Sequence, residues 1–175
     1  LKLEKTDFSF FADKSDILIK NFSGESKFLQ IKEGDLKLKL SPVLNLQSNF
    51  KTILKFDNNL EKIDFLNDIK YAKYLKNLNA ELNNNLSLQF DKTYKVMNYD
   101  YKVNGKILKA VLERSNPIEI KFLENQMSKL SLVDTSIKIQ IDPNKRNTNF
   151  SGKYSINDDK FLNINFENVI KKDSS

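Results

Sequence analysis

The stretch from Asp35 to Phe56, DLKLKLSPVLNLQSNFKTILKF, constrains the fold more than any other part of the chain. Apolar residues occupy every second position in Leu36–Leu40 and, after Pro42, most alternate positions in Leu44–Phe56. A period of two is typical of a β-strand with one apolar and one polar face. At about 3.3 Å per residue, the second part would extend on the order of 45 Å, against a usual strand of about 5–6 residues. We therefore expect a large sheet organised around this strand.

Similar alternation recurs along the rest of the chain and predicts about eleven strands joined by short connections. Short connections favour an antiparallel meander, and a sheet this wide is expected to twist, curl or close. The fold class that we predict is mainly β: a long curved meander, open as a groove or half-barrel, or else closed as a sandwich or barrel. A slip in the alternation indicates a bulge near Met97-Asn98. The predicted turns or strand breaks lie at Ser23-Gly24, Glu33-Gly34-Asp35, Asn83-Asn84-Asn85, Asn104-Gly105, Asn116-Pro117, Asp142-Pro143-Asn144, Ser151-Gly152 and Asn157–Lys160.

One segment departs from the strand pattern. Between Leu60 and Leu78 the apolar residues recur at helical spacing, and charged residues occupy the other side, as in an amphipathic helix. Asn58 and Glu61 resemble a capping box at its start. We predict a helix near residues 60–78 that packs on or caps the sheet. A sharper hypothesis is that it gates an open groove through Ile63, Leu66, Ile69 and Leu75.

Composition excludes several classes of chemistry. The 175 residues include no Cys, no His and no Trp, so a thiol nucleophile, an imidazole base and the usual zinc sites are excluded. Only four glycines are present, and none forms a phosphate-binding loop. No pair of carboxylates has an acid–base partner in an apolar setting. We therefore expect no enzymatic activity, no metal and no cofactor.

The basic charge does not indicate a nucleic-acid partner. There are 29 basic and 23 acidic residues, but Lys outnumbers Arg 27 to 2. Nucleic-acid binders usually use more Arg and cluster it, whereas here Lys is spread over alternate strand positions. A solvated sheet face is the simpler interpretation, with attraction to an anionic membrane surface as a minor alternative.

The chain fits a single β-rich unit, residues 1–175, within a larger repeat-like protein. Leu1 is not a start Met, and no apolar run approaches the roughly 18–20 residues that span a bilayer. We expect any targeting segment or tether to lie outside this chain, and the tail 171–175 to be frayed.

The pattern resembles the AsmA-like superfamily of Gram-negative envelope proteins, which includes the YhdP and TamB types. The residues that carry the resemblance are IKNFSGESKFLQIKEGDLKLKL (Ile19–Leu40), DKTYKVMNYDYKVNGKI (Asp91–Ile107) and the helical pattern Ile63–Leu78 between strand blocks. The resemblance implies an internal segment of a periplasmic β-groove, tethered to the inner membrane, that conducts phospholipid toward the outer membrane. Its expected partners are phospholipid acyl chains, the inner membrane and outer-membrane or periplasmic proteins.

Such a groove would place apolar side chains along one continuous face. The residues predicted to line it are Leu38, Leu40, Leu44, Leu46, Phe50, Leu54, Phe56, Leu86, Leu88, Phe90, Ile118, Ile120, Phe122, Ile137, Ile139, Ile141, Leu162, Ile164 and Phe166. The same residues would form the interior of a closed structural or adhesive sandwich, because both folds put them on one face. A third hypothesis is a soluble carrier that holds a single lipid in a half-barrel under the helix.

Overall fold

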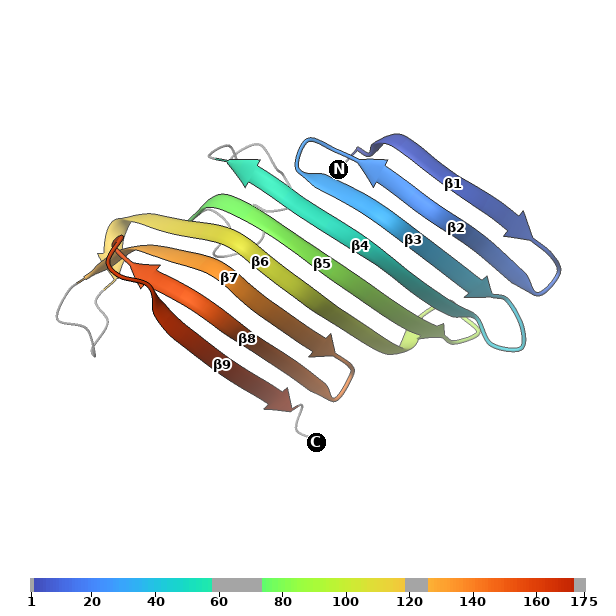
Figure 1. Cartoon of the computed structure of the whole chain (residues 1–175). Coiled ribbons are helices and arrows are strands. Elements are labelled where there is room, and N and C mark those ends of the chain that lie inside the picture. The colour runs from blue at the N-terminus through green and yellow to red at the C-terminus, as the bar shows by residue number, and fades with distance from the viewer. Residues whose placement is uncertain (1, 58–73, 119–125, 172–175) are drawn as a thin grey trace.

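The computed structural model describes residues 2–57, 74–118 and 126–171, and its strands form one antiparallel sheet (Figure 1). Each strand pairs with its neighbours in sequence, and β1 and β9 are the edges. The mainly β, antiparallel meander is thus confirmed as an open sheet. A sandwich needs two packed sheets, and all nine described strands belong to one. The strands are β1 (Glu4–Ala12), β2 (Asp16–Glu25), β3 (Leu29–Lys39), β4 (Asn45–Asp57), β5 (Leu75–Phe90), β6 (Val96–Ile118), β7 (Met127–Ile141), β8 (Lys145–Ile156) and β9 (Leu162–Lys171).

The long central strand is confirmed. β4 runs for 13 residues and pairs with β5 from Asn45↔Gln89 to Asp57↔Asn77 without a register shift. Pro42, which lacks an N–H for a ladder, lies in the connection between β3 and β4. β4 and β5 therefore form a regular ladder from Asn45↔Gln89 to Asp57↔Asn77, and the bulge in β5 lies before this ladder, between Leu75 and Asn77.

Several predicted turns are wrong, because the ladders run through them. Gly24, Gly34, Gly105 and Gly152 all lie inside strands. Gly105 is paired on both sides, with Leu82 of β5 and Ile137 of β7. A glycine inside a strand often marks a close approach of another backbone, and that is its role here. The structure has nine described strands where the pattern suggested eleven, because β3, β5, β6 and β8 each continue through a predicted turn or break.

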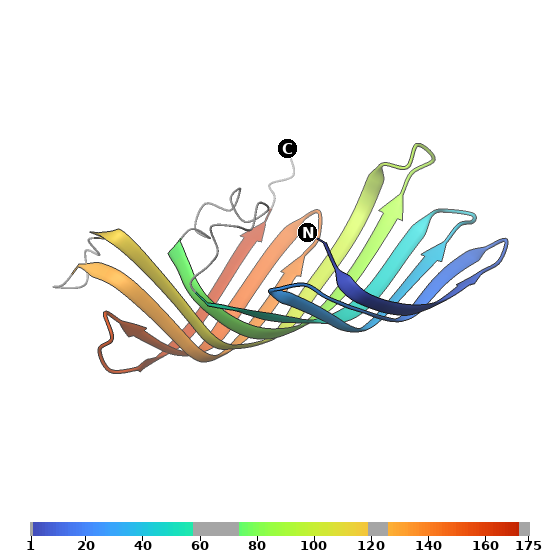
Figure 2. The ribbon, with the colours of Figure 1, turned by 90° about the horizontal axis from the view of Figure 1, so that it is seen from above.

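Bulges bend the outer strands. Lys5, Asn21, Glu33 and Asp134 have positive φ, and each lies at a register shift between neighbouring strands. A bulge with a left-handed residue adds one residue to its strand and bends it. Figure 2 shows the result: the strands bend partway along their length, and the sheet is curved rather than flat. The curl expected of a wide sheet is therefore present.

Three other local predictions are confirmed. Gln89 pairs with Asn98 and Phe90 with Val96, so that Met97 is the extra residue of a bulge. The Asp142–Asn144 turn joins β7 to β8, and Asn157–Lys160 lies in the hairpin between β8 and β9. In each hairpin the flanking strands have the predicted alternation of apolar and polar residues, so the turn falls in the polar segment between them.

The predicted helix is wrong where the structure can test it. Leu75 and Leu78, its last apolar positions, belong to β5 and pair with Leu112 and Ala110 of β6. Pairing with the neighbouring strand stabilises the extended conformation of this segment more than the helical spacing of its apolar residues stabilises a helix. Ile63, Leu66 and Ile69 lie outside the described residues, as do most of residues 60–78. Among the described residues no α-helix is present.

Burial is slight for a chain of this size. Five apolar side chains of the described residues are buried: Phe56, Ala80, Val103, Ala110 and Val111. Phe56 packs against Phe28, Leu75 and Leu78, which form a small cluster near one end of the strands. Most other apolar side chains on the sheet are only half-buried, as expected of a single layer without a second layer packed on it.

Candidate lipid-binding face

The register places apolar side chains of successive strands in rows across one side of the sheet. Paired residues of adjacent strands share a face, so a chain of pairs traces a row from strand to strand. One row runs from β2 to β9 without a charged side chain. Its members are Gly24, Ile31, Thr52, Leu82, Gly105, Ile137, Phe150 and Phe166.

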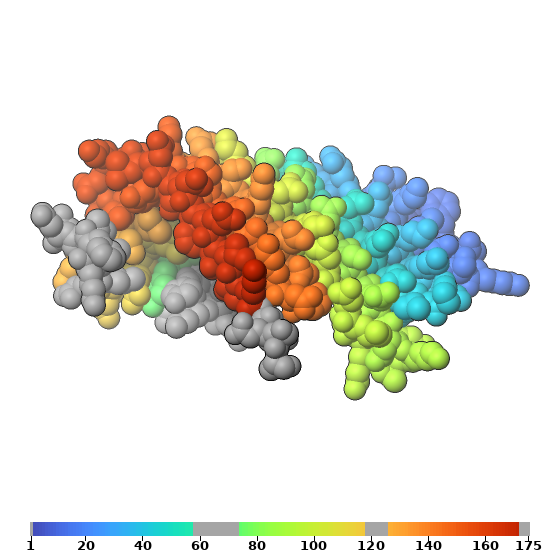
Figure 3. Space-filling view, turned by 90° about the horizontal axis from the view of Figure 1, so that it is seen from below, coloured from blue at the N-terminus to red at the C-terminus, as the bar shows by residue number. Residues whose placement is uncertain are grey.

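Two further rows lie on the same face, separated from the first by the row that contains Phe50, Asn84, Val103 and Ile139. The second row consists of Phe10, Ile19, Leu36, Ser48, Leu86, Tyr101, Ile141 and Arg146. The third row consists of Ile17, Leu38, Leu46, Leu88 and Tyr99. We call the side of the sheet that holds these three rows the apolar face. Figure 3, a view from below, shows the strands succeeding one another in chain order along the molecule.

The structure brings most of the predicted lining residues together. Leu46 lies between Leu38 and Leu88 across three strands, and Phe150 stacks on Phe166 with ring centroids 4.9 Å apart. Phe56 is buried, and Leu162 and Phe166 are exposed at the β9 edge. Many of the predicted lining residues lie in described strands, and the structure describes their side chains. They are Leu38, Leu46, Phe50, Leu54, Phe56, Leu86, Leu88, Phe90, Ile137, Ile139, Ile141, Leu162, Ile164 and Phe166.

Other predicted residues are not placed on the face by strand pairing. Leu40 and Leu44 lie in the connection between β3 and β4. Ile118 is the last residue of β6, and only its backbone is described, whereas Ile120 and Phe122 lie outside the described residues. The prediction also missed members of the rows, among them Ile31, Leu36, Leu82, Tyr101 and Phe150. For Ile31 the reason is the bulge at Glu33, which changes which parity faces the same side of β3. Leu36 and Leu82 have the same parity as the predicted Leu38 and Leu86, so their place on the face was visible in the alternation.

A hollow on the apolar face has a volume of about 270 Å³. It lies where β2, β3 and β4 bend, and its surface is almost entirely apolar. Small-molecule sites occupy about 300–1,000 Å³, so the hollow suits part of an alkyl chain better than a whole ligand. The residues lining it are Ile19, Phe22, Ile31, Gly34, Asp35, Leu36, Ser48 and Phe50.

The polar side chain of Asn84 is buried within the apolar face, and its hydrogen bonds are satisfied. Asn84 is 4% exposed, and its amide donates to Phe50 O (3.2 Å), Thr52 Oγ1 (3.1 Å) and Leu82 O (3.3 Å). Its Oδ1 accepts from the Tyr101 hydroxyl at 2.8 Å. A buried amide with partners costs little, whereas one without partners is expensive. Burial also raises the pKa of Tyr101, so that its hydroxyl remains a donor.

The opposite side of the sheet carries most of the charged and polar side chains of the strands. Lys37 pairs with Asp16 at 3.7 Å and Lys51 with Glu81 at 3.4 Å, and exposed pairs of this kind add little stability. Hollows of about 580 and 600 Å³ on this side are larger than the apolar one. Their linings are mixed, with carboxylates, amides, hydroxyls and lysines among apolar groups, whereas the lining of the smaller hollow is almost entirely apolar. Size alone therefore does not select the functional face.

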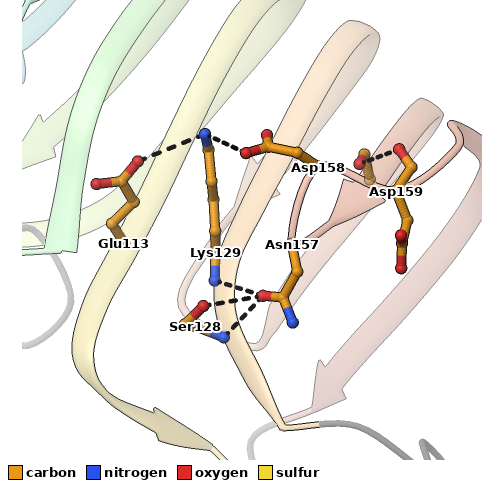
Figure 4. A network of polar contacts seen from close by, with 7 residues as sticks. Glu113, Ser128, Lys129, Asn157, Asp158 and Asp159 are labelled. Atoms are coloured by element: carbon orange, nitrogen blue, oxygen red, sulfur yellow. Dashed lines mark hydrogen bonds and ion pairs between the residues drawn. The ribbon is translucent and has the colours of Figure 1, made fainter.

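A polar network fixes the turn after β8 (Figure 4). Asn157 Oδ1 accepts from the backbone N–H of Ser128 (3.0 Å) and of Lys129 (3.1 Å), and from the Ser128 hydroxyl. Lys129 Nζ lies 2.8 Å from the Asp158 carboxylate and 3.6 Å from that of Glu113. The hydrogen bond that Lys129 donates to the Asp158 carboxylate raises the pKa of Lys129. The network ties the β8–β9 turn to the start of β7, and we assign it a structural role.

Among the described residues no three His, Cys, Asp or Glu side chains are grouped so that they could hold a metal ion. No helix in the described ranges has the length and hydropathy to cross a membrane.

The described part of the chain thus defines a class: a single-layer, open antiparallel sheet with one apolar and one polar face. No protein-family profile matches the chain, and no solved structure matches it. The chain is similar to the phenylalanine–tRNA ligase beta subunit of Mycoplasma capricolum, with 30% identity over 150 residues. The match covers 78% of this chain but 18% of the ligase subunit, so the chain spans less than a fifth of that relative's length.

Proposed function

We propose that this chain binds the acyl chains of phospholipids on its apolar face and forms a segment of a lipid-conducting β-groove. The observation that carries the proposal is the set of three paired rows, which cross up to eight strands of one open sheet and consist mainly of apolar residues, with two glycines, Ser48, Thr52 and Arg146 among their members. An apolar surface of this extent on a single layer needs something to cover it.

An acyl chain is a suitable occupant on energetic grounds. Moving an alkyl chain into water costs about 0.8 kcal/mol per CH₂, or roughly 13 kcal/mol for a sixteen-carbon chain. A continuous apolar face removes most of that cost along the whole path. The charged head group can remain in water beside the sheet. No side chain has to perform chemistry, which is compatible with a chain that lacks His and Cys.

The wider setting is part of the proposal. The resemblance to the AsmA-like superfamily supports a periplasmic segment of a longer protein, anchored to the inner membrane of a Gram-negative bacterium and delivering phospholipid toward the outer membrane. The ligase relative does not extend the proposal to aminoacylation, because the chain corresponds to a small fraction of that protein.

Photo-crosslinking tests the assignment of the face. A photoreactive residue at Leu46 or Leu88, which pair on the apolar face, should crosslink phospholipid in vesicles or in cells. The matched control is Gln47, which is exposed on the other side of the same strand, with Lys37 paired to it as a second control. Equal labelling of both faces would contradict the proposal. A single saturable lipid per chain would instead indicate a carrier rather than a conduit.

A further inference from the structure

Lysine and arginine are separated between the two sides of the sheet. The register places the lysines of the described ladders on the polar side, opposite the apolar face. They are Lys20, Lys32, Lys37, Lys39, Lys51, Lys55, Lys102, Lys106, Lys109, Lys129, Lys138, Lys145, Lys153 and Lys171. The arginine that these ladders pair, Arg146, lies on the apolar face instead. A general need for solvated positive charge does not account for this difference, because lysine meets that need elsewhere on the sheet.

The position of Arg146 is fixed by two ladders. In β8 it pairs with Ile141 of β7 and with Ile170 of β9, in the row that also holds Tyr101. Arg146 is exposed, and it forms no ion pair with a carboxylate of the described residues. Its guanidinium group therefore lies beside apolar side chains and is open to an anionic ligand.

Two uncharged polar residues lie beside Arg146 on the same face. Thr148 is two positions further along β8, and Asn168 of β9 pairs with Thr148. The paired positions of the apolar face in β7, β8 and β9 hold no carboxylate that would repel an anion. A guanidinium, a hydroxyl and an amide all donate hydrogen bonds, and together they suit the oxygens of one phosphate group.

We propose that Arg146, with Thr148 and Asn168 beside it, binds the phosphate of a phospholipid whose acyl chains lie on the apolar face. This inference rests on the proposed function. Arg146 is the second residue of β8, next to the turn between β7 and β8 at one end of the strands (Figure 1). A head group at this end stays in water, while the acyl chains reach the rows of apolar residues. The planar guanidinium can hold two phosphate oxygens at once, whereas a lysine ammonium acts as a point charge.

The other arginine is a less suitable site. Arg114 is half-buried, and its guanidinium carbon lies 4.6 Å from the centroid of the Tyr74 ring. An arginine over an aromatic ring has one side of its guanidinium plane covered. We therefore assign the phosphate to Arg146 alone.

Two lipids that differ in the head group test the assignment. The probes are dioctanoylphosphatidylglycerol and dioctanoylglycerol, which have the same acyl chains with and without a phosphate, titrated calorimetrically into the full chain. Arg146→Gln should weaken phosphatidylglycerol binding by about tenfold or more, because a hydrogen bond to a charged group is lost. It should leave dioctanoylglycerol binding and the far-UV circular dichroism spectrum unchanged, because the side chain is exposed.

Two further variants test the role of the guanidinium. Lys145→Gln is the matched control, since it removes the same charge from the neighbouring residue, which pairs with Lys171 on the polar side. It should bind both lipids as the unmodified chain does. Arg146→Lys should recover only part of the phosphatidylglycerol affinity, and full recovery would contradict two-point binding by the guanidinium.

The remaining outcomes separate this inference from the proposed function. If Arg146→Gln bound both lipids normally, the phosphate site would be wrong and the lipid-binding face would stand. An equal loss in Lys145→Gln would also contradict the site, because net charge would then be the cause. Inorganic phosphate that bound as tightly as the phospholipid would contradict the assignment to a head group. Binding of neither lipid to the unmodified chain would contradict both proposals.

Discussion

Gly105 of β6 lies directly against the backbone of Glu81 in β5. A Cβ at Gly105 would lie 2.1 Å from the Glu81 carbonyl oxygen and 2.8 Å from Leu82 Cα. The backbone cannot yield there without disturbing ladders on both sides, because Gly105 pairs with Leu82 and with Ile137. The close approach in the centre of the sheet therefore depends on the absence of a side chain.

Gly105→Ala should destabilise the sheet by about 1–3 kcal/mol, because the added methyl group forces a backbone shift. Gly24→Ala is the matched control, since its Cβ would meet the Thr6 methyl group at 3.0 Å, and a side chain can move. The control should lose no more than about 1 kcal/mol. Urea unfolding followed by circular dichroism measures both. Equal losses would mean that the approach of the Glu81 backbone is not limiting.

Asn84→Ala should cost about 1–3 kcal/mol, because it leaves the part-buried Tyr101 hydroxyl without its partner and removes the side-chain hydrogen bonds to Phe50 O and Thr52 Oγ1. Asn85→Ala, one residue along and exposed on the polar side, should change stability by no more than about 0.5 kcal/mol. The same unfolding measurement compares them. If the two variants were equally stable, the hydrogen bonds of Asn84 would not contribute as described.

The alternation of apolar residues predicted much of this fold. It located β4, and it placed Leu38, Leu46 and Leu88 on one face, because burial of one face imposes a period of two. It failed at Asn84 and Gly105, where local turn preference is strong. Each of these residues lies in a strand that is paired on both sides, and the two ladders outweigh that preference.

The bulges were mostly beyond sequence reasoning. Bulge residues in the left-handed conformation are usually glycine. Here they are Asn21, Glu33 and Asp134, so no glycine marks these bulges in the sequence. Each bulge changes the parity of the residues that follow it. The bulge at Glu33 therefore puts Ile31 on the same face as Leu36 and Leu38 although their positions differ in parity, and Ile31 went unrecognised as a member of the apolar face.

Stability should fall with rising pH partly because of Tyr101. Burial raises its pKa above the ordinary value of about 10. A raised folded-state pKa gives a contribution that is complete below pH 10 and is lost as the pH rises through the folded-state pKa. Tyr101→Phe should therefore lose less stability than the unmodified chain above pH 10. Lys5 and Lys129 have the same sign but are common to both proteins. Parallel pH curves would contradict the assignment.

Asp91 should titrate below its ordinary range because of the turn between β5 and β6. Its Oδ1 accepts from the Thr93 hydroxyl and N–H, both at 2.7 Å, and from the Lys95 N–H at 3.0 Å, and these bonds lower its pKa. The stability that Asp91 contributes is present above about pH 4 and lost as the pH falls through its folded-state pKa. Carboxyl NMR should show that Thr93→Ala raises the Asp91 pKa. No change would rule out the hydroxyl as the principal cause.

Leu46→Asp and Leu88→Asp should abolish lipid binding without unfolding the chain, because both side chains are only half-buried on an open sheet. Loss of the circular dichroism spectrum in these variants would indicate instead that the face is closed. Gln47→Asp, which adds the same charge on the polar side of β4, should leave lipid binding unchanged.

The most direct test of the lipid-binding face is mass spectrometry of lipid extracted from the chain after purification from bacterial cells. The account predicts phospholipid in the unmodified chain and in Gln47→Asp, and its loss from the Leu46→Asp, Leu88→Asp double variant. An unmodified chain that is folded but carries no phospholipid, and acquires none from vesicles, would contradict it.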